Sequence, residues 1–504
     1  MKKILLKNKS LSLNTETNFR RIKLLNLRKE TTAFPNNFRK NAISDKLRSI
    51  YGNINNENLL KLNIKVNVAG RIINRRIMGK VSFIILKDIG GKIQLYIARK
   101  NISCINYDKY FKKFDIGDIL GASGKLFKTK TGELTVRCYK IYLLTKSIRP
   151  LPEKFHGLVN KEIKYRQRYL DLISNSKSLK VFKMRSKIIS EIRYFMIKNK
   201  FIEVETPMMH SIPGGANACP FITHYNTLNI DMYLRISPEL YLKKLIVSGF
   251  ERIFEMNRSF RNEGISSRHN PEFTTIELYM AYTDYIDMMI FLEDFFLNLV
   301  KNILDSNIIK YDNKLLNFNP PFVRMTMKEA ICYYCPKINF KMLDDIDYLI
   351  KFAKSIGIKI EKYWELGKIQ TKIFEEIIEK FLIQPTFITS FPIEVSPLAR
   401  RNNENPFFSD RFEFFINGYE IGNGFSELND SEDQAMRFLN QLKIKNIDNN
   451  TNIFYDENYI TSLEYGLPPT SGLGVGIDRL IMLFTNSKNI RDVVFFPTLK
   501  SFFI

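Results

Sequence analysis

A hairpin is predicted around residues 417–418, where an Asn-Gly pair separates two strand-like runs. Asn-Gly is the strongest short-range hairpin signal, because both residues tolerate the positive φ angles that the tight turn needs. With a two-residue turn, Phe415 faces Glu420 and Glu413 faces Gly422. Glu413 and Glu420 then lie on one face as diagonal neighbours, roughly 7 Å apart at their backbones. The pattern therefore predicts a pair of antiparallel strands that bring two carboxylates together.

Two carboxylates at this spacing repel each other unless a cation or a basic group lies between them. Mg²⁺ is commonly bound by one or two carboxylates plus substrate phosphates, so Glu413 and Glu420 form a candidate metal site. The alternative is a surface pair bridged by a lysine or by water. The pattern alone leaves both interpretations open.

A second pair of strands is predicted at residues 254–261 and 273–281. Since side chains alternate between the two faces of a strand, one face here is apolar and the other is polar. The polar face carries Arg261, Phe273, Glu277 and Tyr279, and the connecting loop carries Glu263, Arg268 and His269. An arginine fork matches phosphate geometry, and an aromatic ring can stack on a base. The pattern is compatible with a nucleotide site, although an ordinary half-solvated hairpin would look the same.

A glycine-rich turn at residues 472–479, Gly-Leu-Gly-Val-Gly-Ile-Asp-Arg, precedes an apolar helix. Glycine lets a ligand approach the backbone closely, and a helix N-terminus attracts anions. Arg479 would be well placed to hold a phosphate. The spacing matches neither a dinucleotide fingerprint nor a Walker loop, and glycines needed only for packing are the alternative.

The pattern changes along the chain, which predicts separate domains. Residues 1–60 are basic and are predicted to form a helical extension, whereas several short strands follow between about 64 and 145. Short strands in so few residues suggest a small barrel of the oligonucleotide-binding (OB) type over residues 61–148. Prolines at 150 and 152 indicate a linker over residues 149–172. Residues 173–504 mix helices with antiparallel-looking strands, so an α+β protein is predicted.

Composition narrows the class of protein without deciding it. Lys and Arg number 77 against 52 Asp and Glu, and the net charge of +25 favours polyanions such as nucleic acid. An AT-biased genome would explain the same balance. Five cysteines form a sparse, odd set that suggests a reducing compartment, and the lone pair Cys332 and Cys335 is not expected to bind zinc. No stretch looks able to span a bilayer and the N-terminus does not resemble a signal peptide, so a cytoplasmic protein is predicted.

The segments around 254–281, 411–422 and 472–479, in this order, resemble motif 2, the metal hairpin and motif 3 of class II aminoacyl-tRNA synthetases. Residues 201–207 are similar to motif 1 with its dimer-interface proline, and the HIGH and KMSKS signatures of class I enzymes are absent. An OB barrel ahead of a class II core is the layout of subclass IIb, which contains the aspartyl, asparaginyl and lysyl enzymes.

The resemblance to the bacterial lysyl-tRNA synthetases runs almost from end to end. It is carried by residues 33–36, 75–80, 154–157, 165–171 and 421–428. It implies a class II core of antiparallel sheet with flanking helices, a homodimer, and ATP-dependent attachment of L-lysine to the 3′ end of tRNA(Lys). It also implies that Glu413 and Glu420 bind Mg²⁺.

The resemblance implies roles for the matching residues around ATP. Arg261 would hold the α-phosphate and Arg479 the γ-phosphate, which makes them the catalytic pair. Phe273 would stack under the adenine, and Glu263 and His269 would place the base and the phosphates.

The lysine pocket that the resemblance implies consists of Gly215, Glu239, Glu277, Tyr279, Asn423, Phe425 and Glu427. Of these, Gly215 and Glu239 would meet the α-amino group, while Glu277, Tyr279 and Glu427 would hold the side-chain ammonium. A desolvated ammonium needs compensating carboxylates, whereas an aspartate or asparagine substrate would need a basic or amide partner.

Three barrel residues would read the anticodon according to the same resemblance. By pattern alone Phe83 is predicted to lie in the core, but the resemblance implies that it stacks on an anticodon base. Gln94 alternates with apolar neighbours and would bond a base, and Glu133 on the next turn would read another.

Two positions depart from the family pattern, because Cys219 and Lys500 stand where arginine is frequent.

Three alternatives to a lysyl-tRNA synthetase are open: an aspartyl or asparaginyl enzyme, a paralogue that ligates lysine to a protein, and a non-catalytic RNA-binding protein. The predicted barrel argues against the second alternative. Both arginines and both hairpin glutamates argue against the third.

Overall fold

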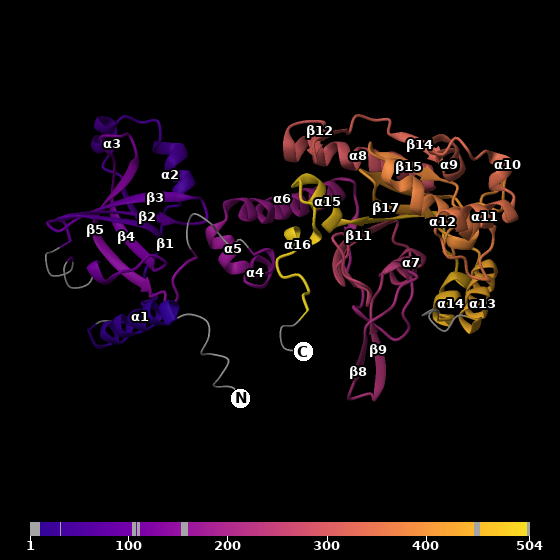
Figure 1. The fold of residues 1–504 in the computed structure, drawn as a ribbon, viewed down its shortest axis with the longest axis horizontal. Coiled ribbons are helices and arrows are strands. Elements are labelled where there is room, and N and C mark those ends of the chain that lie inside the picture. The colour runs from indigo at the N-terminus through magenta and orange to yellow at the C-terminus, as the bar shows by residue number, and fades with distance from the viewer. Residues whose placement is uncertain are drawn as a thin grey trace. The chain divides into compact units, whose positions relative to one another are not determined.

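The computed structural model describes residues 11–30, 32–102, 107, 111–152, 160–447 and 454–500. Figure 1 shows its two compact units, Met1–Val159 and Asn160–Ile504. Residues 154–157, which carry part of the family resemblance, lie outside the described ranges.

The first unit contains a closed barrel of five strands in the order β1-β2-β3-β5-β4, which confirms the predicted barrel. Its strands are β1 (Lys65–Met78), β2 (Val81–Lys87), β3 (Lys92–Ala98), β4 (Ile119–Lys128) and β5 (Leu134–Thr145). Neighbours are antiparallel except β3 and β5, which are parallel. The described helical segments here are α1 (Leu11–Glu30), α2 (Ser44–Tyr51), α3 (Asn56–Leu62) and the 3-10 turn η2 (Phe111–Lys113).

The prediction from pattern alone that Phe83 belongs to the barrel core is wrong. On β2 the fully buried positions are Ser82, Ile84 and Leu86, and alternation turns Phe83 to the outer face. There its ring lies 5.5 Å from that of Tyr96, which in turn lies 5.7 Å from that of Phe127. The outer face of the barrel therefore carries an aromatic row.

The second unit is organised by an eight-stranded sheet in the order β14-β15-β16-β17-β18-β11-β10-β6. Its strands are β6 (Ile202–Glu203), β10 (Arg252–Phe260), β11 (Glu272–Ala281), β14 (Val323–Thr326), β15 (Thr386–Thr389), β16 (Arg411–Ile416), β17 (Tyr419–Ser426) and β18 (Thr470–Gly476). The pairs β14·β15 and β6·β10 are parallel, and the central pairs are antiparallel. The predicted α+β class with a largely antiparallel sheet is confirmed.

Two small sheets and the remaining helical segments surround the large sheet. The small sheets are formed by β7 (Met209–His210), β8 (Ile222–Tyr225) and β9 (Ile230–Leu234), and by β12 (Ile308–Tyr311) and β13 (Lys314–Asn317). The helices are α4 (Lys161–Arg166), α5 (Arg168–Ser174), α6 (Ser176–Lys198), α7 (Glu239–Val247), α8 (Tyr285–Leu304), α9 (Met327–Tyr334), α10 (Phe340–Leu343), α11 (Ile346–Ser355), α12 (Leu366–Ile373), α13 (Ser431–Ile447), α14 (Glu457–Glu464), α15 (Ile477–Phe484) and α16 (Ile490–Val493). The π-helical η3 (Phe374–Ile378) and the 3-10 turns η4 (Glu379–Phe381) and η5 (Ile393–Val395) complete the described helical segments.

Residues 161–198 form the three consecutive helices α4, α5 and α6. Asn175 separates the last two, because its side chain accepts hydrogen bonds from the backbone N–H groups of Lys177 and Ser178 and so caps α6. After α6, the segment that resembles motif 1 contributes only the two-residue strand β6.

The large sheet buries its apolar face under α6, α8 and α15, which lie together on one side of it (Figure 1). Phe254, Ile276, Leu278, Phe414 and Val475 are buried in this core. Their strands alternate, so the neighbouring side chains project from the opposite face, where α7 contacts β10 and β11. The polar face predicted for β10 and β11 is that opposite face.

Candidate active site

A row of residues crosses the polar face of the sheet from strand to strand. Glu255 on β10 pairs with Glu277 on β11, which pairs with Gly474 on β18. Gly474 pairs with Asn423 on β17, and Asn423 pairs with Glu413 on β16. Since Gly474 has no side chain, nothing projects from this face of the sheet between Glu277 and Asn423.

The next row of the same face contains Tyr279, Gly472 and Phe425. A Cβ atom on Gly472 would lie 2.6 Å from the Tyr279 ring and would collide with Oε1 of Glu427. Glycine is therefore required at 472, because the two side chains occupy the space above it. The glycine-rich turn predicted from the sequence forms this part of the sheet and leads directly into α15.

Acidic side chains gather beside Gly474 around one buried lysine. The hydroxyl of Ser237 lies 3.2 Å from both carboxylate oxygens of Glu277. One helical turn into α7, the ammonium of Lys243 donates to Oε1 of Glu239 at 2.7 Å. Lys243 also pairs with Oε2 of Glu427, and both of these side chains are completely buried. Glu239, Glu277, Glu427 and Lys243 thus form one charged cluster.

The acids of this cluster are poorly solvated. Burial, reinforced by the carboxylate of Glu239, raises the pKa of Glu277 to about 8. Burial likewise raises the pKa of Glu427 to about 8, although the ammonium of Lys243 opposes the shift. Oε1 of Glu427 is buried and has no hydrogen-bond partner among the described residues. A buried acceptor without a partner is costly, so the cluster is suited to bind a cation.

Gly215 and Phe425 complete the surroundings of this cluster. Gly215 has a φ of +83°, which favours glycine, and a Cβ there would lie 3.0 Å from the Cβ of Glu239. The ring of Phe425 lies 5.3 Å from the ammonium of Lys243. Every residue predicted for the lysine pocket therefore lies in or beside one region of the polar face.

Arg261 lies at the end of β10 with its guanidinium over the ring of Phe273, 5.1 Å from the ring centroid. Its Nε atom is buried, and no hydrogen-bond partner for it exists in the described ranges. The charge of Arg261 also lowers the pKa of Glu277, which places the guanidinium near the acidic cluster. A half-buried arginine guanidinium beside an aromatic ring can form part of an anion-binding site.

Arg479, at the start of α15, joins the loop after β10 to the hairpin. One guanidinium nitrogen donates to the backbone carbonyl of Glu420 at 2.5 Å and lies 3.4 Å from its carboxylate. The other lies 3.2 Å from Nε2 of His269. Burial and the charge of Arg479 lower the pKa of His269, with Glu263 opposing them, so the residues predicted for ATP meet in one place.

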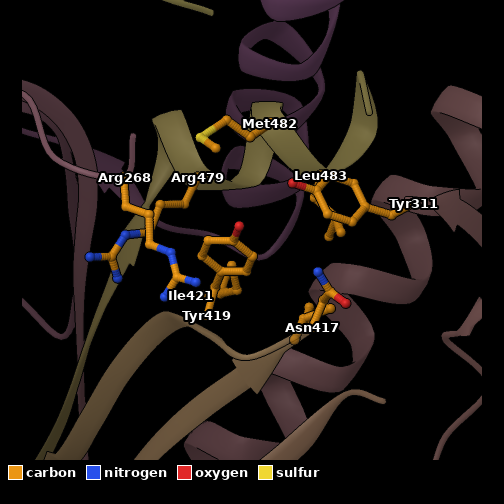
Figure 2. A pocket seen from close by; sticks show the side chains of 9 residues that line it. Arg268, Tyr311, Asn417, Tyr419, Ile421, Arg479, Met482 and Leu483 are labelled. Carbon is orange, nitrogen blue, oxygen red and sulfur yellow. The ribbon is translucent and has the colours of Figure 1, made fainter. Parts of the chain in front are cut away.

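Figure 2 shows Arg268 and Arg479 beside the ring of Tyr419. The Arg268 guanidinium lies 4.1 Å from the centroid of that ring. The small pocket around them is lined by Arg268, Tyr311, Ile416, Asn417, Tyr419, Ile421, Arg479, Met482 and Leu483. The hairpin turn therefore closes one side of the region around Arg479, where the γ-phosphate is predicted to bind.

The hairpin register differs in one place from the prediction. Phe415 pairs with Glu420 as predicted, but Glu413 pairs with Asn423 instead of Gly422. The reason is a β-bulge, which leaves Ile421 as an extra residue on β17. The turn signal specifies the loop but carries no information about a bulge three residues away.

Glu413 and Glu420 belong to a larger acidic group than predicted. Burial raises the pKa of Glu413 to about 8, Arg411 opposes the shift, and Glu420, Glu379 and Glu375 add to it. Burial and Glu420 raise the pKa of Glu379 to about 7. Such crowding of hard oxygen ligands fits a divalent cation. The described ranges nevertheless contain no group of three or more acidic, His or Cys residues close enough to be a metal site on their own.

Comparison with known proteins identifies the family. Residues 160–500 match the family described as tRNA synthetases class II (D, K and N), and residues 66–144 match the OB-fold nucleic acid binding domain. A lysine–tRNA ligase of Baumannia cicadellinicola subsp. Homalodisca coagulata is 61% identical over 489 residues, 97% of each chain. Those of Edwardsiella ictaluri and Sodalis glossinidius are 60% identical over 491 residues, again 97% of each chain.

The chain belongs to the lysine–tRNA ligase family. The predicted family resemblance, the OB barrel and the enzyme class, a ligase, are confirmed. Within the described residues, no helix has both the length and the apolarity needed to cross a membrane.

The anticodon residues predicted for a lysine–tRNA ligase lie on the barrel surface of the first unit. Phe83 lies in the aromatic row described above, and Gln94 donates to the hydroxyl of Thr135 at 3.2 Å. Glu133, on the turn before β5, lies 3.6 Å from Arg48, and both side chains are about half exposed.

The two departures from the family pattern contribute through their backbone. The carbonyl of Cys219 accepts a hydrogen bond of 2.7 Å from the N–H of Asn262, next to Arg261. The carbonyl of Lys500 accepts from the guanidinium of Arg166. Any residue at these positions provides the same carbonyl.

The sequence-based prediction missed Lys243, Arg411, Glu375 and Glu379. A signal for Lys243 was present, because Glu239 and Lys243 are four residues apart and a Glu followed by a Lys at that spacing pairs on a helix. Arg411 donates hydrogen bonds to Glu413 at 2.5 Å and to Asn423 at 3.0 Å. The contact with Asn423 forms only when β16 and β17 pair, so no signal for it was present in the sequence.

Proposed function

We propose that this site activates L-lysine with ATP and transfers the lysyl group to the 3′ end of tRNA(Lys). The observation that carries the proposal is the buried carboxylate of Glu427, whose Oε1 has no partner within the described residues while Glu277 is close by. An ammonium group would satisfy this acceptor and neutralise its neighbour. The side chain of an aspartate substrate would meet the unpaired carboxylate oxygen of Glu427 and the carboxylate of Glu277, both of like charge.

Substrate lysine would lie over Gly474, with Glu427 and Tyr279, above Gly472, at one end. Glu239 and the backbone at Gly215 would meet its α-ammonium, and Glu277, Tyr279 and Glu427 its side-chain ammonium. Asn423 and Phe425 line the wall on β17. The support for this orientation is that the cluster extends from Glu239, beside Gly215, to Glu427, above Gly472.

ATP would occupy the adjoining cationic region. Arg261 would hold the α-phosphate, Arg479 the γ-phosphate, and Phe273 would stack under the adenine, with Glu263 and His269 placing the base and phosphates. In support, the buried Nε of Arg261 has no partner in the described ranges, and Arg479 contacts both Glu420 and His269.

Glu413 and Glu420 would hold Mg²⁺ together with the phosphates. A bound Mg²⁺ neutralises phosphate charge that develops as pyrophosphate leaves. The fit rests on their carboxylate chemistry and on the mutual crowding that raises the pKa of Glu413.

The lysine carboxylate would attack the α-phosphorus of ATP in line, and the bond to pyrophosphate would break. The carboxylate is already ionised, so no general base is needed. Arg261 and Arg479 would act by positioning and by neutralising charge. In the second step the terminal 3′-hydroxyl of tRNA would attack the adenylate carbonyl and release AMP.

The barrel would bind the anticodon through Phe83, Gln94 and Glu133. Stacking and hydrogen bonding to unpaired bases are the usual means of such barrels. The domain limits predicted at 60, 148 and 172, a homodimer and a cytoplasmic location are also part of the proposal.

The deciding measurement is ATP–pyrophosphate exchange with each of the twenty amino acids. Lysine is expected to support exchange at least about a hundredfold faster than aspartate or asparagine, because their side chains cannot pair with the acidic cluster. Exchange driven by aspartate or asparagine, or by no amino acid, would refute the proposal.

A further inference from the structure

We propose that Lys243 is a specificity-determining positioning residue of the lysine site. Its ammonium fixes two of the three pocket carboxylates and sets the charge of the pocket to the value that the substrate neutralises. This inference rests on the proposed function and adds to it a residue that the sequence-based prediction did not include.

Lys243 is built into the pocket wall and cannot move out into solvent. Its side chain is fully buried, and it follows Glu239 by one turn of α7. The ammonium lies 2.7 Å from Glu239 and contacts Glu427, with the rings of Phe425 and Tyr459 at 5.3 and 6.0 Å. Burial lowers the pKa of Lys243, but Glu239 and Glu427 more than offset this effect and raise it, so the charge is permanent.

The charges of the pocket leave a definite excess. Glu239, Glu277 and Glu427 carry three negative charges when ionised, and Lys243 supplies one positive charge. The nearby Glu255 is already paired with Arg235 at 2.6 Å and does not enter the sum. The remaining formal charge of minus two is balanced by the charge of plus two on the two ammonium groups of lysine, whose carboxylate would face Arg261.

Lys243 also decides which oxygen of Glu427 is available. It occupies Oε2, whereas Oε1 lies above Gly472 beside the Tyr279 ring and stays unpaired among the described residues. Without Lys243 the carboxylate would be free to rotate, and its ionised form would lose the stabilisation that the ammonium provides. The resident ammonium therefore fixes the orientation of Glu427 and favours its ionised form when the substrate binds.

The test compares Lys243→Met and Lys243→Ala with the parent enzyme in lysine-dependent pyrophosphate exchange. We expect Lys243→Met to raise the lysine KM roughly 30-fold or more, since truncating one partner of a buried charge pair is costly, while the ATP KM changes less than about twofold. Lys244→Met is the matched control, because the next lysine donates to Asn458, which lies outside the cluster, at 2.6 Å. It should keep the parent lysine KM.

Chemical rescue separates positioning from a purely structural role. Ethylammonium chloride should lower the lysine KM of Lys243→Ala severalfold, because a small ammonium can fill the vacated site, whereas tetramethylammonium chloride, which has no N–H donor, should not. Thermal unfolding with ATP present reports whether each variant is folded.

The outcomes distinguish this inference from the proposed function. A parent enzyme that fails to activate lysine refutes the proposed function and this inference with it. A parent that activates lysine while Lys243→Met keeps the parent KM overturns the role of Lys243 alone. Equal effects of both ammonium salts, or variants that stay unfolded with ethylammonium present, also overturn it, because they indicate a structural role.

Discussion

At the scale of single residues, Glu277 and Glu427 hold protons that a substrate must displace. Burial raises the pKa of each carboxyl to about 8. Near neutral pH the empty pocket is therefore largely protonated, whereas a bound ammonium favours the ionised carboxylates. Lysine binding is thus linked to proton release.

The lysine KM should fall as the pH rises toward and through this pKa. Between pH 7 and about 8.5 we expect a decrease of about tenfold or more, because ionised carboxylates become available while the lysine side chain, with a pKa of about 10.4, stays charged. Pyrophosphate exchange at saturating ATP measures the change, and the ATP KM is the control. A lysine KM that stays constant over this range would argue against Glu277 and Glu427 as its partners.

At the scale of elements, strand β18 supplies space instead of side chains. Gly472 and Gly474 lie on the site face between β11 and β17, where any larger residue would project into the pocket. The two glycines differ in tolerance, because a Cβ on Gly474 would make only an ordinary contact of 3.7 Å with Glu277.

Gly472→Ala should therefore destabilise the second unit, and Gly474→Ala should not. The collision with Glu427 and Tyr279 is expected to cost about 1–3 kcal/mol of unfolding free energy. Denaturant unfolding of both variants measures the difference. An unfolding free energy for Gly472→Ala equal to that of Gly474→Ala would mean that Glu427 can leave its position at no cost.

Strands and turns that depend on local sequence pattern could be predicted, but the contacts between separate segments of the chain could not. Alternation along β10 and β11 predicted the shared polar face of Arg261, Phe273 and Glu277, and the Asn-Gly pair predicted the hairpin. The bulge at Ile421 depends on how β17 pairs with its neighbouring strand. The contact between Arg479 and His269 joins segments that lie far apart in the chain. Single-sequence patterns contain no information about such pairings, which is why Glu375 and Glu379 were missed.

At the scale of the whole molecule, two separate compact units divide the chain. The proposed chemistry lies entirely in the second unit, and the proposed anticodon residues lie entirely in the first. The aromatic row of Phe83, Tyr96 and Phe127 contributes no side chain to the acidic or cationic clusters described above. Amino acid activation and tRNA recognition should therefore be separable by mutation.

Phe83→Ala tests this separation. Loss of one stacking partner, worth roughly 1–3 kcal/mol, should raise the KM for tRNA(Lys) about tenfold, while lysine-dependent pyrophosphate exchange keeps its parent rate. Tyr139→Ala is the matched control, because it removes an exposed aromatic side chain on a different strand of the barrel, β5. If exchange and aminoacylation fall together in Phe83→Ala, the division of labour is wrong.

The bare backbone of β18 has a consequence for redesign. A floor made of peptide groups has no rotamers, so it cannot be enlarged by trimming a side chain and cannot adapt to a bulkier guest. Attempts to make the enzyme accept non-natural amino acids should therefore begin with the walls, on α7 and β17, where substitutions change both volume and charge.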